Sequence, residues 1–230
     1  MTEAEWLVCD DPGNLLTYLE GKGSERQLRL FAIACCRDVW SFLVDERSKE
    51  AMESLERHAD GPLPAEDWEV ARRNARLGFQ AAMTPQCKDA QSPRNPACAA
   101  AMAVWHATPP NPTEAAGRAG YQSANAARRA PNADFIRTFA QACHLQTHFV
   151  RDIFGNPFRP VSFSPAWQTD TALTLARQMY DSRDFSLMPI LADALQDAGC
   201  EDEHILSHCR DPQAAHVRGC WVVDLVLGKV

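Results

Sequence analysis

The sequence predicts an all-α protein, either an irregular bundle of about ten helices or a set of paired helical hairpins. Three observations support this fold class. Apolar residues recur at helical spacing along most of the chain. Residues that cap helices precede these segments, and glycine or proline follows them. Two further segments, about 97–107 and 114–129, are rich in alanine, the strongest helix former.

Local capping signals divide the first part of the chain into helices. Thr2 with Glu5 and Ser24 with Gln27 have the pattern of a capping box, in which each side chain satisfies a free backbone N–H at the helix start. Further start signals are Asp11 before Pro12, Asp45, and Pro64. After a short helix at the start, they predict helices over about 12–20, 24–44, 45–61 and 64–83.

The second part of the chain continues the helical pattern. A long helix is predicted from about Asn132 to Phe154, with an apolar stripe that includes Phe135 and Ile153. Shorter helices are predicted around residues 172–180, 189–198 and 202–209. The final segment, GCWVVDLVLGKV, is almost continuously apolar, and its three valines also suit a strand. No partner strand is evident, so a buried C-terminal helix is favoured.

A segment rich in proline and aromatic residues, Arg151–Trp167, separates two regions of different composition. We therefore divide the chain into an Ala-rich helical region, 1–154, and a compact C-terminal block, 155–230, packed as one globular unit with the first. The segment could form a notch that binds an anion or a peptide. The candidate binding-surface residues are Arg151, Phe154, Asn156, Phe158, Arg159 and Trp167, together with Asp224.

Composition limits the possible partners. The net charge of −7 argues against nucleic-acid binding, for which Arg72, Arg73, Arg118, Arg128 and Arg129 are the remaining candidates. No apolar run reaches the ~18 residues that a membrane helix needs. The acidic N-terminus lacks a secretory pattern, and the number of cysteines, nine, is odd. A reducing cytoplasm is therefore expected.

The C-terminal block has the side chains that a metal site needs. Zinc takes four ligands in a tetrahedron, and imidazoles and thiolates are its usual donors. His216 and Cys220 are four residues apart, as are Cys200, His204 and His208. The alternative is that the thiols are small buried apolar groups and the histidines lie near the surface. The predicted zinc ligands are Cys200, His208, Cys209, His216 and Cys220.

Two other groups are expected to have neither a metal-binding nor a catalytic role. His144, His148 and Asp152 share one helical face, but this face is opposite the phenylalanine stripe and is expected to contact water. Asp224 lies inside the apolar C-terminal run, so a pair with Arg218 or Arg159 is expected rather than a role as catalytic acid.

Several motifs resemble a family of uncharacterised proteins from planctomycete bacteria. They are MTEAEWLVCDDP, LRLFAIACCRDVW, RDIFGNPFRPV and the C-terminal segment ILADALQDAGCEDEHILSHCRDPQAAHVRGCWVVDLVLGK. The resemblance covers both ends of the chain, whereas the centre matches only as an Ala-rich helical region. It implies that Cys200, His208–Arg210 and His216–Trp221 are typical of the family and that His144 and His148 are not. No established activity comes with it.

Two functional hypotheses follow. The first is a non-enzymatic cytoplasmic module for protein interaction or scaffolding, stabilised by zinc and acting with a protein partner. The second is a metal- or thiol-dependent hydrolase or transferase whose site lies in the C-terminal Cys/His block. The sequence contains no phosphate-binding glycine loop, no HExxH motif and no Gly-x-Ser-x-Gly motif.

Overall fold

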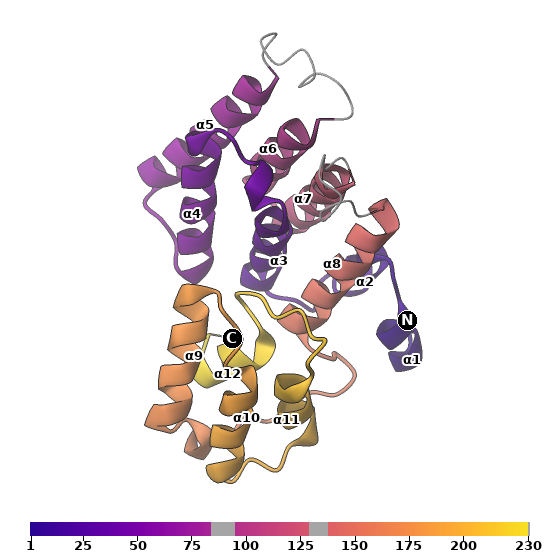
Figure 1. The fold of residues 1–230 in the computed structure, drawn as a ribbon, viewed down its shortest axis with the longest axis vertical. Helices are drawn as coiled ribbons and strands as arrows, with labels where there is room; N and C mark the ends of the chain where they lie inside the picture. The colour runs from indigo at the N-terminus through magenta and orange to yellow at the C-terminus, as the bar shows by residue number, and fades with distance from the viewer. Residues whose placement is uncertain (84–94, 129–137, 230) are drawn as a thin grey trace. The chain divides into compact units, whose positions relative to one another are not determined.

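The computed structural model describes residues 1–83, 95–128 and 138–229, and this part of the chain is all-α, as predicted. It contains twelve α-helices, two short 3-10 helices and no strand within the described residues (Figure 1). The chain divides into two compact units, Met1–Thr147 and His148–Val230. The division falls inside α8 (Phe139–Phe154). None of the described helices is long and apolar enough to cross a bilayer.

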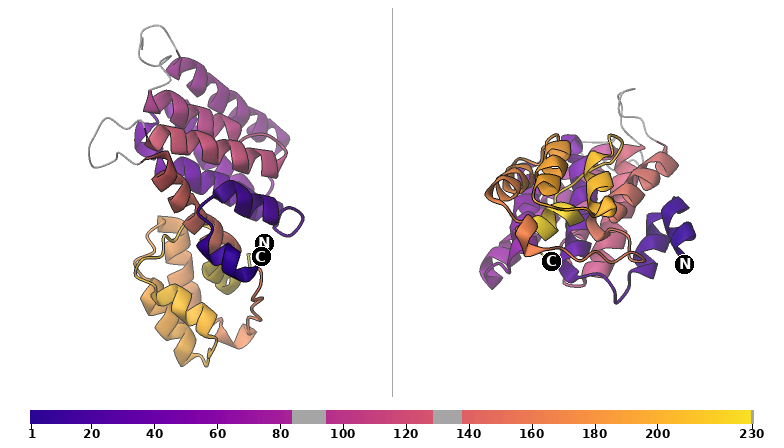
Figure 2. Two further views of the ribbon diagram at one scale, coloured as in Figure 1. Left: turned by 90° about the vertical axis from the view of Figure 1, so that its right-hand side faces the viewer. Right: turned by 90° about the horizontal axis from the view of Figure 1, so that it is seen from below.

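Helices α1 to α7 belong to the first unit. Helix α3 packs against α7, α7 against α6, and α4 against α5; Figure 2 shows these helices, coloured from indigo to magenta. The predicted capping boxes of Thr2 with Glu5 and of Ser24 with Gln27 are both present. The helices are α1 (Glu3–Val8), α2 (Pro12–Tyr18), α3 (Glu25–Asp38), α4 (Glu46–Asp60), α5 (Ala65–Ala82), α6 (Pro96–His106) and α7 (Pro112–Ala127).

Helix α3 is shorter than the sequence predicts. It ends at Asp38 rather than near residue 44, and a 3-10 helix, Trp40–Phe42, follows. The β-branched Val39 at the helix end favours helix only weakly. Arg37 holds this turn, because its guanidinium makes a bidentate pair with Glu56 at 2.8 Å and lies 4.0 Å from the ring centre of Trp40.

The start of the long helix predicted from Asn132, with Phe135 in its stripe, lies outside the described residues. Within them, α8 begins at Phe139. Ala142, Phe149 and Ile153 of its predicted stripe are buried.

The second unit consists of the end of α8, the irregular segment after it, and four helices. They are α9 (Asp170–Ser182), α10 (Met188–Asp197), α11 (Glu203–Arg210) and α12 (Trp221–Leu227), with a 3-10 helix, Pro165–Trp167, before them. Helix α9 packs against α10 and α12, and α10 against α11. The apolar C-terminal run is a helix, as favoured from the sequence. The core of the second unit contains Met179, Leu191, Leu195, Ile205 and Val222.

Candidate metal centre

Four side chains from three separate segments of the second unit converge on one point. Asp152 comes from the end of α8, His208 from α11, and His216 and Cys220 from the connection into α12. One ligand atom of each lies within 4.8 Å of the ligand atoms of the others. Cys220 is fully buried, and the side chains of Asp152, His216 and His208 are only 4%, 7% and 18% exposed. This group could hold a metal ion.

The distances between these atoms are near those of a metal coordination shell, although the two that involve Asp152 are shorter. Oδ1 of Asp152 lies 2.8 Å from Nδ1 of His216 and 3.1 Å from Nε2 of His208. Sγ of Cys220 lies 3.3 Å from Nε2 of His208 and 3.9 Å from Nδ1 of His216. Tetrahedral zinc bonds of about 2.0–2.3 Å require ligand atoms roughly 3.3–3.6 Å apart. One ion therefore fits between them after small shifts.

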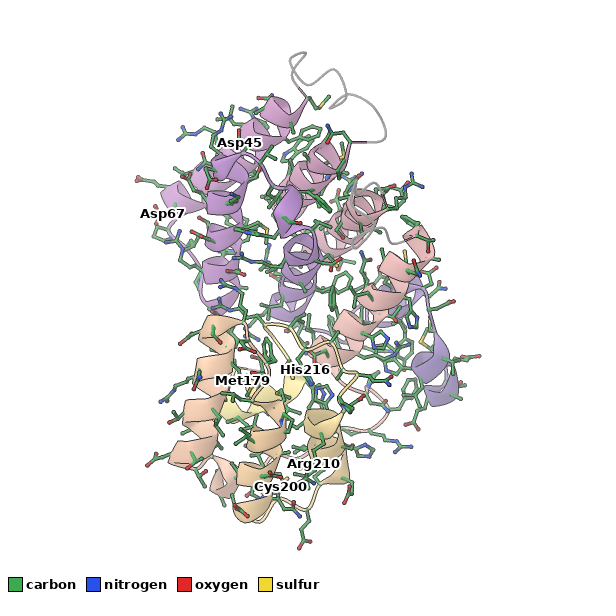
Figure 3. All side chains as sticks on the ribbon, viewed as in Figure 1. Asp45, Asp67, Met179, Cys200, Arg210 and His216 are labelled. Atoms are coloured by element: carbon green, nitrogen blue, oxygen red, sulfur yellow. The ribbon has the colours of Figure 1, made fainter. Side chains whose placement is uncertain are left out.

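Local backbone structure explains how His216 and Cys220 meet. Helix α11 ends at Arg210, and the extended Asp211 is followed by Pro212, which cannot continue the helix. Gly219 has a φ of 97°, a conformation that glycine adopts without steric cost. In this turn the N–H of Cys220 donates to the carbonyl of Val217 at 2.9 Å. The turn directs Cys220 back toward His216, which is labelled in Figure 3.

Neighbouring groups fix the orientation of these side chains. The backbone N–H of Val217 donates to Oδ2 of Asp152 at 2.8 Å, so both carboxylate oxygens are used. The rings of His208 and His216 meet edge to face, with centroids 4.9 Å apart. The indole of Trp221 lies 5.1 Å from the His208 ring. Supporting contacts of this kind are usual around metal ligands.

Burial and hydrogen bonding determine the protonation of the group. Burial alone raises the pKa of Asp152, but hydrogen bonds and positive charge from His208 and His216 outweigh it, so the pKa is lowered. Burial, reinforced by the charge of Asp152, raises the pKa of the Cys220 thiol well above its usual value. Without a cation the thiol is therefore protonated at neutral pH. A bound divalent metal reverses this, since a coordinating thiol is deprotonated.

One polar atom of the group is left without a partner. Nε2 of His216 is buried and makes no hydrogen bond to the residues that the structure describes. Leaving a buried donor or acceptor unpaired costs free energy. If Nδ1 of the same ring binds a metal, Nε2 carries the ring proton and is a buried donor.

The structure brings together three of the five predicted zinc ligands. His208, His216 and Cys220 converge, whereas Cys200 and Cys209 are buried without belonging to the group. Burial raises the pKa of Cys209 to about 12, and the charge of Asp152 adds to this shift. Residue type alone does not distinguish a ligand thiol from a thiol that packs in the core.

Asp152 is the member of this group whose environment differs from the prediction. We expected it to face water, opposite the apolar stripe of its helix, but only 3% of its surface is exposed. The connection between α11 and α12 covers this face, as the bond from Val217 shows. Its neighbour on that face, His144, is exposed. Asp152 is buried by contacts such as that with His216, which lies 64 positions later in the chain. The local sequence pattern does not show such a contact.

Most of the candidate binding-surface residues after α8 are partly buried. Oδ1 of Asn156 accepts a hydrogen bond from the N–H of Phe158 at 3.0 Å. Trp167 packs edge to face on Phe163, with ring centroids 5.3 Å apart. Arg151, Phe154, Asn156, Phe158 and Trp167 are partly buried, Arg159 is exposed and lies 3.4 Å from His204, and Asp224 is buried.

Gly155, which follows α8, packs against Trp221 at the start of α12. Its φ is 65°, and an added Cβ would lie 3.4 Å from the indole of Trp221. Asp224 lies in the same helix, and its carbonyl accepts the N–H of Lys229 at 2.9 Å. The predicted partner Arg218 lies over the ring of Tyr180, with 4.3 Å from its guanidinium carbon to the ring centre.

Comparison with known proteins adds no assignment. No protein-family model matches the chain, and no curated protein or solved structure is significantly similar to it.

Proposed function

We propose that this chain is a zinc-stabilised helical protein of the cytoplasm, with one Zn²⁺ bound by Asp152, His208, His216 and Cys220. The observation that supports this most directly is the convergence of four donor atoms within 4.8 Å in a buried position. Three of the four residues lie in the C-terminal motif that resembles the planctomycete-type family. A reducing compartment keeps the thiolate available for the metal.

The donor set favours zinc over other common cations. Calcium and magnesium prefer shells made of oxygen atoms, and this group offers a single carboxylate. Two imidazoles with one thiolate and one carboxylate are all among the usual ligands of zinc. Zinc also has no preferred geometry of its own, so it tolerates the unequal distances of 2.8–3.9 Å between the donors.

A structural role follows from the closure of the site. Four protein ligands fill a tetrahedron, whereas catalytic zinc keeps one position for water. The ion would link the end of α8 to α11 and to the start of α12, three elements that the chain brings together from distant positions. A small unit with a limited core gains much of its stability from such a link. We propose that the resulting rigid helical surface serves protein interaction or scaffolding.

One feature supports a second candidate function, a zinc-dependent hydrolase. Oδ1 of Asp152 lies at hydrogen-bond distance from both His208 and His216, closer than two ligands of one tetrahedron normally are. Asp152 could then act as a partner of the histidines, and three protein ligands would leave one position for water. The coordination number distinguishes the two candidates.

Zinc analysis of untagged protein tests the site. We expect about one zinc per chain, lost in His208→Ala and in Cys220→Ser. His204→Ala is the matched control, because His204 is exposed one turn earlier on the same helix and lies outside the group. If zinc-supplemented cells yield metal-free protein that also fails to bind added zinc, the proposal is wrong.

The ligand count is measured on the same protein. X-ray absorption at the zinc edge, with Co²⁺ substitution, reports whether four protein atoms or three and a water surround the ion. Four protein ligands support the structural role. An exchangeable water, displaced by added azide, supports the hydrolase.

A further inference from the structure

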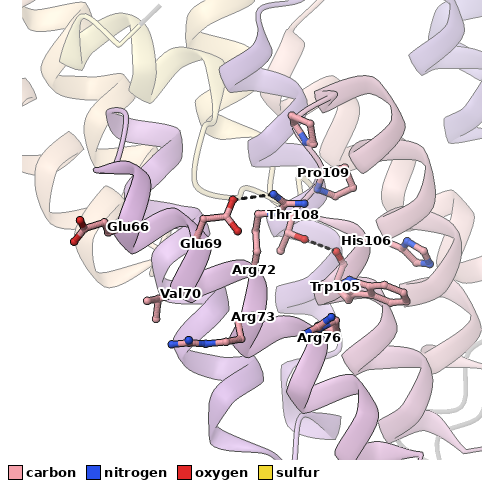
Figure 4. A pocket seen from close by; sticks show the side chains of 11 residues that line it. Glu66, Glu69, Val70, Arg72, Arg73, Arg76, Trp105, His106, Thr108 and Pro109 are labelled. Atoms are coloured by element: carbon pink, nitrogen blue, oxygen red, sulfur yellow. Dashed lines mark hydrogen bonds and ion pairs between the residues drawn. The ribbon is translucent and has the colours of Figure 1, made fainter.

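The first unit contains a cleft that no part of the metal centre explains. It has a volume of about 590 Å³ and lies between α5 and the end of α6 with the segment after it. Figure 4 shows the side chains that line it. Pockets of this size hold ligands of several functional groups. Arg72, Arg73 and Arg76 come from α5, and Trp105, Pro109 and Pro110 form the facing side.

The α5 side of the cleft carries excess positive charge. Arg72, Arg73 and Arg76 are all exposed. Arg72 is paired with Glu69 at 2.9 Å. Arg73 and Arg76 have no acidic partner among the residues that the structure describes. Two guanidinium groups are thus available to bind an anion, in a chain whose net charge is −7.

A further guanidinium group, that of Arg29, contacts Pro110, which lines the cleft. Nη2 of Arg29 donates to the carbonyl of Pro110 at 3.1 Å, and Nη1 of Arg29 is buried with no acceptor in the described part of the chain. Burial lowers the pKa of Arg29, more than the charge of Glu25 raises it. A ligand carboxylate near Pro110 would be attracted by Arg29 as well.

The facing side of the cleft is mostly apolar. Trp105 is 36% exposed, and its ring is stacked with Phe79 at 5.1 Å and with His106 at 5.3 Å between centroids. Burial, then the charge of Arg118, lowers the pKa of His106, so this ring is neutral at pH 7. Pro109 and Pro110 have no backbone N–H and a restricted φ. This side suits an apolar side chain next to the carboxylates.

The chemistry favours a peptide over a nucleic acid. Two rings already stack on Trp105, which leaves less of its face for a nucleobase. Glu66 and Glu69 also line the cleft and would repel a continuous phosphate backbone. A peptide can present carboxylates to the arginines only and an apolar side chain to the tryptophan.

We propose that this cleft binds an acidic segment of a partner protein, with its carboxylates on Arg73 and Arg76 and an apolar side chain against Trp105 and Pro109. The proposal extends the interaction role suggested above by naming a surface and the chemistry of its partner. The cleft lies wholly within Met1–Thr147. Failure of the zinc proposal would therefore leave it intact, and the two are tested by separate measurements.

Fluorescence anisotropy tests the binding. The probe is a short fluorescein-labelled peptide of alternating glutamate and leucine, and its control has glutamine in place of glutamate. We expect the acidic probe to bind at about 20 mM ionic strength and to bind less tightly as salt is added, because exposed charges are screened. Equal binding of the glutamine peptide, or no binding of the acidic one, overturns the proposal.

Paired variants locate the binding site. Arg73→Gln with Arg76→Gln should weaken binding about tenfold or more through two lost charge-assisted contacts. Arg57→Gln with Arg177→Gln removes the same charge from two exposed positions outside the cleft and should have less than about a threefold effect. Circular dichroism confirms that each variant is folded. Equal effects of the two pairs would refute the site.

Removing a negative charge from the cleft should tighten the binding of the acidic peptide. Glu69→Gln removes the partner of Arg72 and should tighten binding roughly threefold, because a third guanidinium becomes available. Single-stranded oligo(dT) provides the last comparison. If oligo(dT) binds more tightly than the acidic peptide and depends on Arg73 and Arg76, the cleft binds nucleic acid and the peptide assignment is wrong.

Discussion

Oδ1 of Asp152 lies 2.8 Å from Nδ1 of His216, although 64 positions separate the two residues in the chain. The second oxygen of Asp152 accepts the N–H of Val217 at 2.8 Å. One buried carboxylate thus fixes the connection before α12 to the end of α8. Closing so long a loop costs conformational entropy, and burying the charge costs desolvation. The centre is stable only because each oxygen has a partner, and this makes Asp152 its most sensitive residue.

Replacing Asp152 by asparagine should remove zinc and destabilise even the metal-free protein. The side chain keeps its size but loses its charge, and it has one acceptor oxygen in place of the two that face Val217 and His216. We expect a loss of about 1–3 kcal/mol in the free energy of unfolding, measured by urea titration in EDTA. Asp193→Asn is the control, since its carboxylate is 69% exposed, and should change stability by less than about 0.5 kcal/mol. Equal stability of the two variants would contradict this account.

Zinc binding should release protons. The thiol of Cys220 is protonated at neutral pH because burial raises its pKa, so the metal must displace that proton. The apparent affinity should rise about tenfold per pH unit for each proton released. Titration calorimetry in buffers of different ionisation enthalpy measures the number directly. A heat of binding that is the same in every buffer would show that Cys220 is not a ligand.

Removing zinc should lower the thermal stability of the native protein. A ligand that binds only the folded state stabilises it by about 2.7 kcal/mol when its concentration is 100 times its dissociation constant. We expect added zinc to raise the unfolding temperature of the metal-free protein and EDTA to reverse the change. Cys220→Ser should show no such response to zinc, whereas Cys200→Ala, outside the group, should keep it.

The fold and part of the site follow from local sequence signals. Capping boxes such as that of Ser24 with Gln27 act over three residues, so the start of α3 was predictable. The end of α3 was not, because the contacts of Arg37 with Glu56 and Trp40 depend on how α4 packs. His208, His216 and Cys220 were found by residue type.

The remaining features depend on distant segments. Asp152 was assigned to a solvated face, because the chain that covers this face lies in another part of the sequence. The cleft combines α5 with the end of α6 and the residues after it, so the sequence offered Arg73 only as one of five candidates for nucleic-acid binding. Its relation to Trp105 required the packing of the two helices.

Alkaline pH should destabilise the protein through buried thiols. Burial raises the pKa of Cys36 to about 12, whereas an exposed thiol in the unfolded chain titrates near about 8.5. Above that lower value the unfolded state has lost the proton that the folded state retains, so stability falls as pH rises. The contribution is about 1.4 kcal/mol per pH unit between the two pKa values. Urea unfolding at pH 8 and 10 should show a smaller decline for Cys36→Ala than for the native protein; equal declines would refute the assignment.

Two glycine-to-alanine changes should have effects of opposite sign. A Cβ at Gly78 in α5 would collide with Oγ of Ser48 in α4 and lie 3.2 Å from its backbone nitrogen. At Gly117 in α7 the added Cβ meets no atom within 4 Å. Alanine favours a helix by up to about 1 kcal/mol over glycine, and overpacking costs about 1–3 kcal/mol. Urea unfolding should therefore show that Gly117→Ala stabilises and Gly78→Ala does not. If both variants gain stability equally, the close packing of α4 on α5 is not required for the fold.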